Sequence, residues 1–416
     1  MISQDFGQES SLPNHPRSTR MALIASLAFN IGVGSVMGTP GVLLPQMKQY
    51  LGVSTEMAST GMLAIMVFAS IFAPQMGALA VRRSLRGLLT AASLMMAAAW
   101  LVMFLSHSYF VYIAADALLL GPTMAITGSV LAPTLVTRWF HRNRGLAIGL
   151  VHLPIMVAVM PLAAQWLILH IGLRSTFLML AALPLVTILP ASRFIEDWPP
   201  EQGPGADVAA VGPGHGPSVT IGQMLGQPRF WALTLAVTAP NVSSVLLGQH
   251  LVSMAESWGI APMSAAGLAA VMSFVGMAGT VALGVVADRI GGARTLVVMA
   301  AADCALWLCL LTRPSYPVLA GLIGMIGFFG AGAVPAISKA YADAFGRTSF
   351  SRAIGLMPAI MLPFMAIGLI GPGTALRLYG NYGPAIIGMV IAFVGAFLAA
   401  LSVALARKPA AEVATA

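Results

Sequence analysis

The chain has 416 residues, of which 58% are hydrophobic and only 8% are charged, and its formal net charge is +8. A soluble globular domain carries about 25% charged residues, so this composition excludes a water-soluble protein. The positive charge does not indicate nucleic-acid binding, because the Lys and Arg residues stand singly or in pairs at the ends of apolar segments. The sequence therefore predicts an all-α integral membrane protein in a lipid bilayer.

Twelve apolar segments are each long enough to cross the membrane, which takes roughly 20 helical residues. They cover residues 21–47, 56–80, 87–107, 109–137, 145–170, 175–193, 230–255, 264–287, 293–312, 316–339, 353–376 and 383–406. The first of them is too long for the apolar core of a signal peptide, so we expect the protein to be retained in the membrane through it. An even number of spans places both termini on one side.

Basic residues indicate which side that is. If both termini are cytoplasmic, only Lys48, Arg174, Arg313 and Arg377 of the 21 Lys and Arg residues fall on the opposite side. Lys and Arg accumulate in the short cytoplasmic loops of membrane proteins. We therefore expect an inner-membrane protein with cytoplasmic tails at residues 1–20 and 407–416.

One long polar insert separates the spans into two groups of six. Residues 194–229 contain Pro-Pro, Gly-Pro-Gly and Gly-Pro-Gly-His-Gly-Pro stretches, which are typical of a flexible linker. The sequence thus predicts a six-helix bundle at 21–193, a cytoplasmic linker, and a second six-helix bundle at 230–406.

The two halves repeat each other. A charged turn occurs as GALAVRRSLR at Gly77–Arg86 and as GVVADRIGGAR at Gly284–Arg294, and the first glycines are 207 positions apart. A second pair is the AIGL shared by RGLAIGL, which starts at Arg144, and RAIGL, which starts at Arg352; Ala147 and Ala353 are 206 positions apart. Repeats in parallel register predict two pseudo-symmetric bundles.

This architecture resembles the major facilitator superfamily. In that family the turn reads glycine, three residues, aspartate, arginine, one residue, glycine and then basic residues. The second copy keeps Gly284, Asp288, Arg289, Gly291 and Arg294. The first copy departs from the pattern, with Val81 in place of the aspartate and Ser84 in place of the second glycine.

Two further segments are similar to the monocarboxylate-porter-like branch and its bacterial organic-acid carriers. These are Trp139–Leu150 at the start of the fifth span, and Gly41–Pro45 leading to Leu51–Ser54 at the end of the first. The resemblance implies a transporter and not an enzyme, and one that works by rocker-switch alternating access.

The charged turns are the candidate gates. Gly284 allows a close helix approach, Asp288 can face the N–H groups at the start of another helix, and Arg289 and Arg294 can bind the same surface. The resemblance implies that the partner of Asp288 lies at Arg144. The first half lacks the acid, so we expect a weaker gate built from Gly77, Arg82 and Arg86. The alternative is that both turns only set the topology.

Ionisable residues within apolar spans are costly in lipid and are therefore candidates for function. Asp116 lies about seven residues into the fourth span, which lines the cavity in the family it resembles, and we assign proton coupling to it. The alternative is a carboxylate satisfied by neighbouring hydroxyls. Asp303 lies in the peripheral ninth span, where a structural role is favoured, and His170 and His250 are expected at the membrane interface.

Polar side chains near the middle of cavity-lining spans are the candidate substrate contacts. They are Asn30, Thr123, His152, Asn241 and Ser244. An amide that faced lipid would lack hydrogen-bond partners, so the alternative for the asparagines is a contact between helices. For His152 it is a packed, hydrogen-bonded ring.

The spans hold no nucleotide-binding loop, no metal cluster of His and Cys, and no paired catalytic carboxylates, so we expect no cofactor, no metal and no enzyme activity. No Arg or Lys lies in the central part of a cavity-lining span, which disfavours a dianionic substrate. The sequence predicts proton-coupled uptake of a monocarboxylate, aromatic acid or lactone by a monomer. Proton-coupled efflux of hydrophobic compounds and a non-transporting membrane sensor are the alternatives.

Overall fold

The structure is a computed structural model that describes residues 15–140, 144–200 and 221–406. Within the helices, the side chains at 81, 82, 137, 144–146, 221, 342, 346–355, 358 and 359 are outside the description. The predicted tails, and residues 201–220 of the predicted linker, fall largely or wholly outside the described residues.

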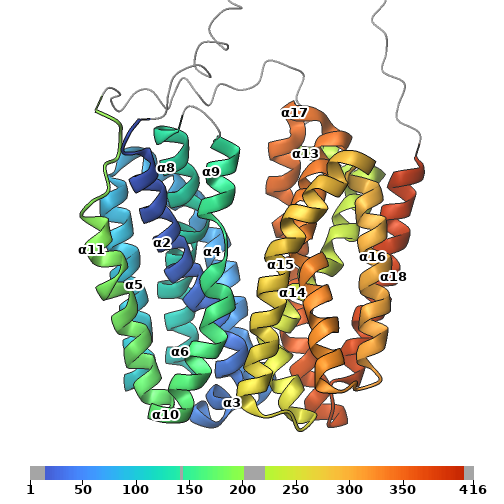
Figure 1. Cartoon of the computed structure of the whole chain (residues 1–416), viewed down its shortest axis with the longest axis horizontal. Coiled ribbons are helices and arrows are strands. Elements are labelled where there is room, and N and C mark those ends of the chain that lie inside the picture. The colour runs from blue at the N-terminus through green and yellow to red at the C-terminus, as the bar shows by residue number, and fades with distance from the viewer. Residues whose placement is uncertain (1–14, 141–143, 201–220, 407–416) are drawn as a thin grey trace, which may run out of the picture. The chain divides into compact units, whose positions relative to one another are not determined.

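All regular structure in these ranges is helical, as the composition predicted (Figure 1). The helices of the first half are α2 (Ser18–Gly38), α3 (Pro40–Leu51), α4 (Thr55–Arg82), α5 (Leu85–Leu105), α6 (Tyr109–Ala115), η2 (Asp116–Leu120), α7 (Gly121–Met124), η3 (Ala125–Val130), α8 (Leu131–Trp139), α9 (Arg144–Val151), α10 (Ile155–Val186) and α11 (Ile188–Ser192). They are followed by α13 (Ile221–Leu225), α14 (Pro228–Ser257), α15 (Pro262–Ile290), α16 (Gly292–Leu310), α17 (Tyr316–Tyr379) and α18 (Gly383–Leu405).

Eleven segments of the described chain are long and apolar enough to cross a membrane, and they correspond to the twelve predicted spans. One of them, Ala147–Ser192, has 46 residues, too many for a single pass. Gly172 lies within it at φ 80° and ψ 164°, a conformation that breaks the helix and that glycine adopts readily. This segment therefore makes two passes, as predicted, and α17 supplies two more at Tyr316–Phe345 and Ile360–Tyr379.

The first predicted span is divided near its end. Helix α2 stops at Gly38 and α3 starts at Pro40, because the proline has no N–H to continue the ladder of α2. In the first half, α3 lies at the end opposite to the start of α2 (Figure 1). We call this the α3 end.

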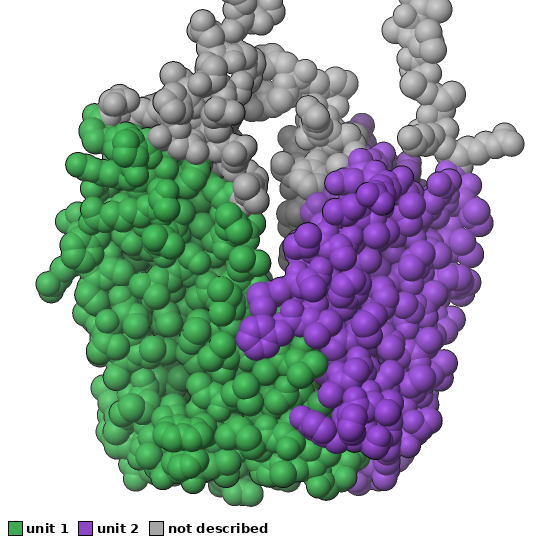
Figure 2. All heavy atoms as spheres, viewed as in Figure 1, with its two compact units in different colours: residues 1–213, 247–273, 369–378 green, residues 214–246, 274–368, 379–416 purple. Residues whose placement is uncertain are grey.

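Packing divides the chain into two compact units that differ from the sequence halves (Figure 2). Unit 1 comprises residues 1–213 together with 247–273 and 369–378. Unit 2 comprises residues 214–246, 274–368 and 379–416. The last turns of α14, the first turns of α15 and one stretch of α17 therefore belong to unit 1, although the repeat assigns them to the second half.

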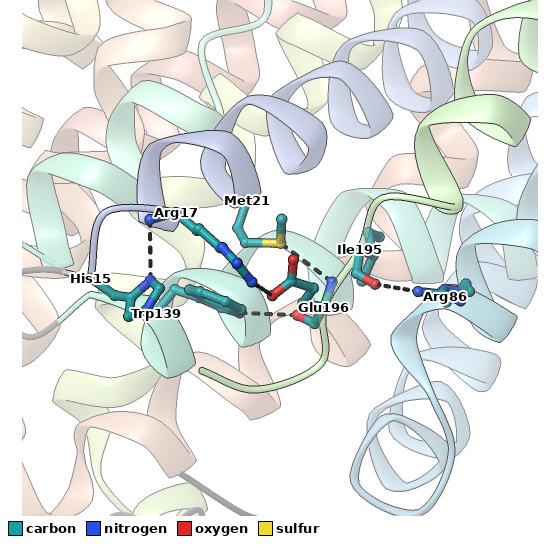
Figure 3. Close-up of polar contacts among 7 residues, drawn as sticks. All are labelled: His15, Arg17, Met21, Arg86, Trp139, Ile195 and Glu196. Atoms are coloured by element: carbon teal, nitrogen blue, oxygen red, sulfur yellow. Dashed lines mark hydrogen bonds and ion pairs between the residues drawn. The ribbon is translucent and has the colours of Figure 1, made fainter. Parts of the chain in front are cut away.

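The start of the predicted linker is folded against unit 1. Arg17 forms an ion pair with Glu196 at 3.0 Å, and Trp139 Nε1 donates to the Glu196 carbonyl at 3.0 Å (Figure 3). Arg86 donates to the Ile195 carbonyl at 3.1 Å, and the Ile195 side chain is buried. The polar composition of 194–229 did not reveal this docked segment.

Asp197 continues the docked segment and binds the start of α5. Its carboxylate accepts a hydrogen bond from the Leu85 N–H at 2.7 Å, which is one of the donors that a helix start leaves without a partner. We expect Asp197→Ala to lower the free energy of unfolding by about 1–2 kcal/mol, the usual contribution of a helix-capping acid. Thermal melting of the purified chain measures the change.

Asp343→Ala is the matched control. Asp343 forms a surface pair with Lys339 at 3.1 Å, four residues away on α17, and such pairs contribute only about 0.3–0.5 kcal/mol. Equal melting temperatures for the two variants would contradict the role assigned to Asp197.

Candidate functional site

Asp116 is the buried acid of the fourth span and lies inside unit 1. Only 2% of its surface is exposed. Its carboxylate and the Tyr112 hydroxyl together fill the space that a side chain at Gly61 of α4 would occupy, and the Asp116 and Tyr112 side chains form a hydrogen bond. The Tyr112 hydroxyl also donates to the Ala58 carbonyl at 2.9 Å. The glycine at position 61 of α4 therefore leaves the space that the Asp116 and Tyr112 side chains occupy.

The helix that carries Asp116 changes its winding at this point. Two π-helical stretches, η2 and η3, flank the short α7, and the Gly121 N–H bonds to the Asp116 carbonyl five residues back. Pro122 lies directly after this bond and has no N–H of its own, which favours a local break in the α-helical ladder. π-helical turns frequently occur at functional positions because they re-aim neighbouring side chains.

A cavity of about 40 Å³ adjoins Asp116. It is lined by residues of α2, α3, α4, α5, α6 and η2, and by Gln249 of α14. Apart from Pro40 and Tyr112, all of the residues that line it are buried. Its polar side chains are Thr39, Trp100, Tyr112, Asp116 and Gln249, and no basic residue is among them.

His250 follows Gln249 on α14 and is fully buried; the predicted depth at the membrane interface stays a prediction. Its Nε2 contacts the Leu369 carbonyl of α17 at 2.7 Å and the Ser59 hydroxyl of α4 at 3.4 Å. Hydropathy placed this histidine near a helix end, but it could not show that three helices of unit 1 meet there. His170, by contrast, is exposed and stacks on Trp166.

Two more contacts join the same helices at the α3 end. Glu56 of α4 forms an ion pair with Arg377 of α17. A Cβ at Gly41 of α3 would lie only 2.6 Å from the Gly248 carbonyl of α14, so the two backbones touch. Together with His250, these contacts tie α3 and α4 to the parts of α14 and α17 that belong to unit 1.

Asn30 joins two helices in this conformation. Its amide Nδ2 donates to the Ser26 carbonyl at 3.0 Å, and its Oδ1 accepts from the Met156 N–H at 3.0 Å. Met156 is in the first turn of α10, where the N–H groups have no helical partner. The geometry therefore favours the helix-to-helix role that the sequence left open beside substrate contact.

We expect Asn30→Ala to lower the free energy of unfolding by about 1–2 kcal/mol, because it removes the cap of α10, and to leave the KM for transport unchanged. Thermal melting and initial-rate uptake measure the two effects. Asn241→Ala is the matched control for melting, since the Asn241 Nδ2 donates to the Val237 carbonyl of its own helix at 2.7 Å and joins no second helix among the described residues. A raised KM in Asn30→Ala without a change in melting would contradict the helix-linking role.

Thr123 and His152 differ in accessibility. Thr123 is fully buried and donates to the Leu119 carbonyl at 2.8 Å and the Ala92 carbonyl of α5 at 3.3 Å. His152 is half-buried at the break between α9 and α10, with Nδ1 on the Ile148 carbonyl at 2.8 Å and its ring against Phe29. Of the two, only His152 has accessible side-chain surface that a solute could contact.

In unit 2, Asn241 is half-buried and Ser244 is exposed, one turn apart on α14. The Ser244 hydroxyl donates to the Pro240 carbonyl at 3.0 Å. Ser243 is buried and accepts a hydrogen bond from Trp307 of α16 at 3.1 Å. Asp303, on α16 as well, is buried, in keeping with a structural position.

The second charged turn has its acid and bases on the surface. Asp288, Arg289 and Arg294 are all exposed. A Cβ added to Gly284 would lie 3.6 Å from the Cβ of Pro335 on α17. Gly291 makes the turn into α16 at φ 90°, which favours glycine. The side chain of Arg144, the expected partner of Asp288, lies outside the described residues.

The first charged turn is built differently. Ser84 replaces the turning glycine, and its hydroxyl accepts from the Arg86 N–H at 3.2 Å. Asp197 supplies an acid at this turn, where the sequence has Val81 in the motif position. A Cβ on Gly77 would meet nothing within 4 Å, and the side chain of Arg82 is not described. Asp197 lies 116 positions after Val81, and the motif alone did not point to it; the weaker first-half gate stays a prediction.

Comparison with known proteins fits this architecture. The profile of the Major Facilitator Superfamily matches residues 22–302, more than half of the chain. Monocarboxylate transporter 13 from Bos taurus is 28% identical over 340 residues, which cover 78% of this chain and 72% of that protein. The crystal structure of a bacterial homolog to the human lysosomal transporter Spinster, described as inward-facing and unoccupied, has the same fold, with a TM-score of 0.65 and 13% identity over 94% of this chain and 95% of that one. The chain therefore belongs to the major facilitator superfamily, and it is a multi-pass membrane transporter and not an enzyme.

Proposed function

We propose that this protein imports a small organic acid by coupling its movement to protons, and that Asp116 is the residue that carries the proton. The substrate class is a monocarboxylate, an aromatic acid or a lactone. The relation to a monocarboxylate transporter supports the class. We place the protein in the inner membrane as a monomer, with both termini in the cytoplasm, on the distribution of its basic residues.

The burial of Asp116 beside neutral partners is the observation that carries the proposal. Only 2% of its surface is exposed. Its carboxyl forms a hydrogen bond with the Tyr112 hydroxyl, which also lies 2.9 Å from the Ala58 carbonyl. No basic residue lines the adjoining cavity to balance a charged Asp116, and an unpaired buried charge is strongly unfavourable. The arrangement fits an acid that holds a proton in this conformation.

The polar residues with accessible surface are the proposed substrate contacts. These are His152 in the first half and Asn241 and Ser244 in the second. We leave out Asn30 and Thr123, because the hydrogen bonds recorded for them join neighbouring helices. Each of these side chains can hydrogen-bond a carboxylate or carbonyl group, which suits a singly charged or neutral acid.

The charged turns are the proposed cytoplasmic gate. Asp288, Arg289 and Arg294 are exposed, and Arg144 is the proposed partner of Asp288 when this gate closes. In the first half, Asp197 joins Gly77, Arg82 and Arg86 in this gate. The contacts of His250, Glu56 and Gly41 at the α3 end would then form the opposing gate on the outer side.

Uptake of labelled monocarboxylates, aromatic acids and lactones into cells that express the protein tests the proposal, with and without a protonophore. We expect one class to accumulate and the protonophore to abolish its accumulation. Failure of every compound to accumulate would overturn the proposal. If expressing cells instead hold less of a hydrophobic dye until the protonophore is added, the protein is an exporter. Ligand binding without any flux would identify a sensor.

A further inference from the structure

Two polar side chains of the cavity beside Asp116 have atoms with no protein partner. They are the Nε1 of Trp100 on α5 and the Oε1 of Gln249 on α14, which no described residue reaches with a hydrogen bond. Only 4% of Trp100 and 3% of Gln249 is exposed. A buried polar group without a partner costs about 1–3 kcal/mol. Both residues line the cavity, so a molecule bound there could supply the missing partners.

Size and chemistry define the occupant. On this measure of volume one water molecule takes about 10–15 Å³, so the cavity of about 40 Å³ has room for a few waters. Its lining includes an acid and no base, which excludes an anion. The indole Nε1 can only donate a hydrogen bond, and a donor facing the cavity disfavours a metal cation. Water satisfies the donor of Trp100 and the acceptor of Gln249 at the same time.

We propose that this cavity holds a cluster of ordered water that carries the proton to and from Asp116, with Trp100 and Gln249 as the residues that position the water. The proposal rests on proton coupling at Asp116. In the transfer, the O–H bond of the Asp116 carboxyl breaks as an O–H bond forms on the nearest water, and the charge passes along the cluster. The return of a proton reverses the step.

Gln249 connects this water cluster to the transport cycle, because it comes from the second half of the repeat. Trp100, Tyr112 and Asp116 belong to the first half of the repeat, whereas Gln249 is on α14 of the second half, next to the His250 contacts with Ser59 and Leu369. When α14 separates from α4 during transport, it removes one wall and one hydrogen-bond acceptor from the cluster. Asp116 then meets outside water, and the helix movement is coupled to proton release.

Trp100→Phe and Gln249→Met test the proposal, because each keeps the bulk of the side chain and removes its polar atom. In liposomes with the full chain, we expect pH-gradient-driven uptake to slow about two- to tenfold, the factor that an ordinary hydrogen bond contributes, while counterflow at equal pH is unchanged. Trp166→Phe and Gln49→Met, at exposed positions, are the matched controls.

Replacing sodium by choline in the buffers is expected to leave uptake unchanged. A loss of uptake in choline would assign the cavity to Na⁺ and overturn the proposal.

Melting of the purified chain gives a readout that needs no transport. If water satisfies the two atoms, neither variant melts at a higher temperature than the wild type; if the cavity is dry, removing an unsatisfied atom raises the melting temperature and overturns the proposal. A fall in counterflow as well as in driven uptake would also overturn it, by identifying a substrate subsite. Another outcome is unchanged uptake in Trp100→Phe and Gln249→Met while driven uptake is still lost in Asp116→Asn. That result would overturn the water relay and leave the proposed function intact. A wild type without any pH-driven uptake would overturn both.

Discussion

Replacing Asp116 by Asn is expected to end accumulation of the substrate against its gradient and to leave its exchange across the membrane intact. The amide has nearly the shape of the carboxyl and can hydrogen-bond the Tyr112 hydroxyl through its oxygen or its N–H, so the packing against Gly61 is kept. It cannot release a proton. The variant is therefore expected to equilibrate its substrate in liposomes, with the accumulation ratio falling to about one under a pH gradient that drives the wild type above it.

Counterflow and gradient-driven uptake, measured on the same liposomes, separate the two effects. Asp343→Asn, at the exposed pair with Lys339 on α17, is the matched control and is expected to behave as the wild type. Accumulation by Asp116→Asn equal to that of the wild type would show that the proton is carried elsewhere. Loss of both counterflow and driven uptake would point to a damaged fold.

Replacing Gly41 by Val is expected to open the contacts at the α3 end. A Cβ at this position already falls 2.6 Å from the Gly248 carbonyl, a backbone atom that cannot turn away as a side chain can. Overpacking of this kind costs about 1–3 kcal/mol, which would lower the ratio of closed to open molecules about 5- to 150-fold. The variant is expected to transport slowly because it returns less often to the closed form.

Labelling measures this opening directly. Met62, which lines the cavity and is buried, is replaced by Cys in a chain whose Cys304 and Cys309 are serine. A charged thiol reagent that does not cross the membrane is expected to label it faster from outside when Gly41 is Val. Gly388→Val on α18 is the control, because a Cβ there would meet nothing within 4 Å. Equal labelling rates in all three chains would contradict the assignment of Gly41 to the closed contact.

The sequence was sufficient for the helical architecture because lipid imposes it. Every backbone group within the membrane needs a partner in its own helix, so apolar length alone predicted twelve spans, even where Gly172 and the long α17 hide a boundary. The charged turns were also visible, since Gly291 takes a conformation that favours glycine. Asp116 stood out because an acid is rare in such a segment.

The contacts that surround Asp116 were beyond the sequence for a physical reason. Gln249 and Asp116 are 133 positions apart. Many residue pairs at this separation never come into contact, and a single sequence does not show which of them do. His250 and Asn30 show the same limit, because periodicity gives the position of a polar side chain along a helix but not the helix it faces. Asp197 was hidden by its setting in a Pro- and Gly-rich stretch, where composition predicted only a linker.

The most direct test of proton coupling is the flux of protons itself. Liposomes containing the wild type and a trapped pH indicator are given a gradient of the transported acid with no initial pH difference. The proposal predicts that the internal pH decreases as the substrate enters. This decrease is expected to be missing with Asp116→Asn and to persist when sodium is replaced by choline. Substrate entry by the wild type at a constant internal pH would contradict it.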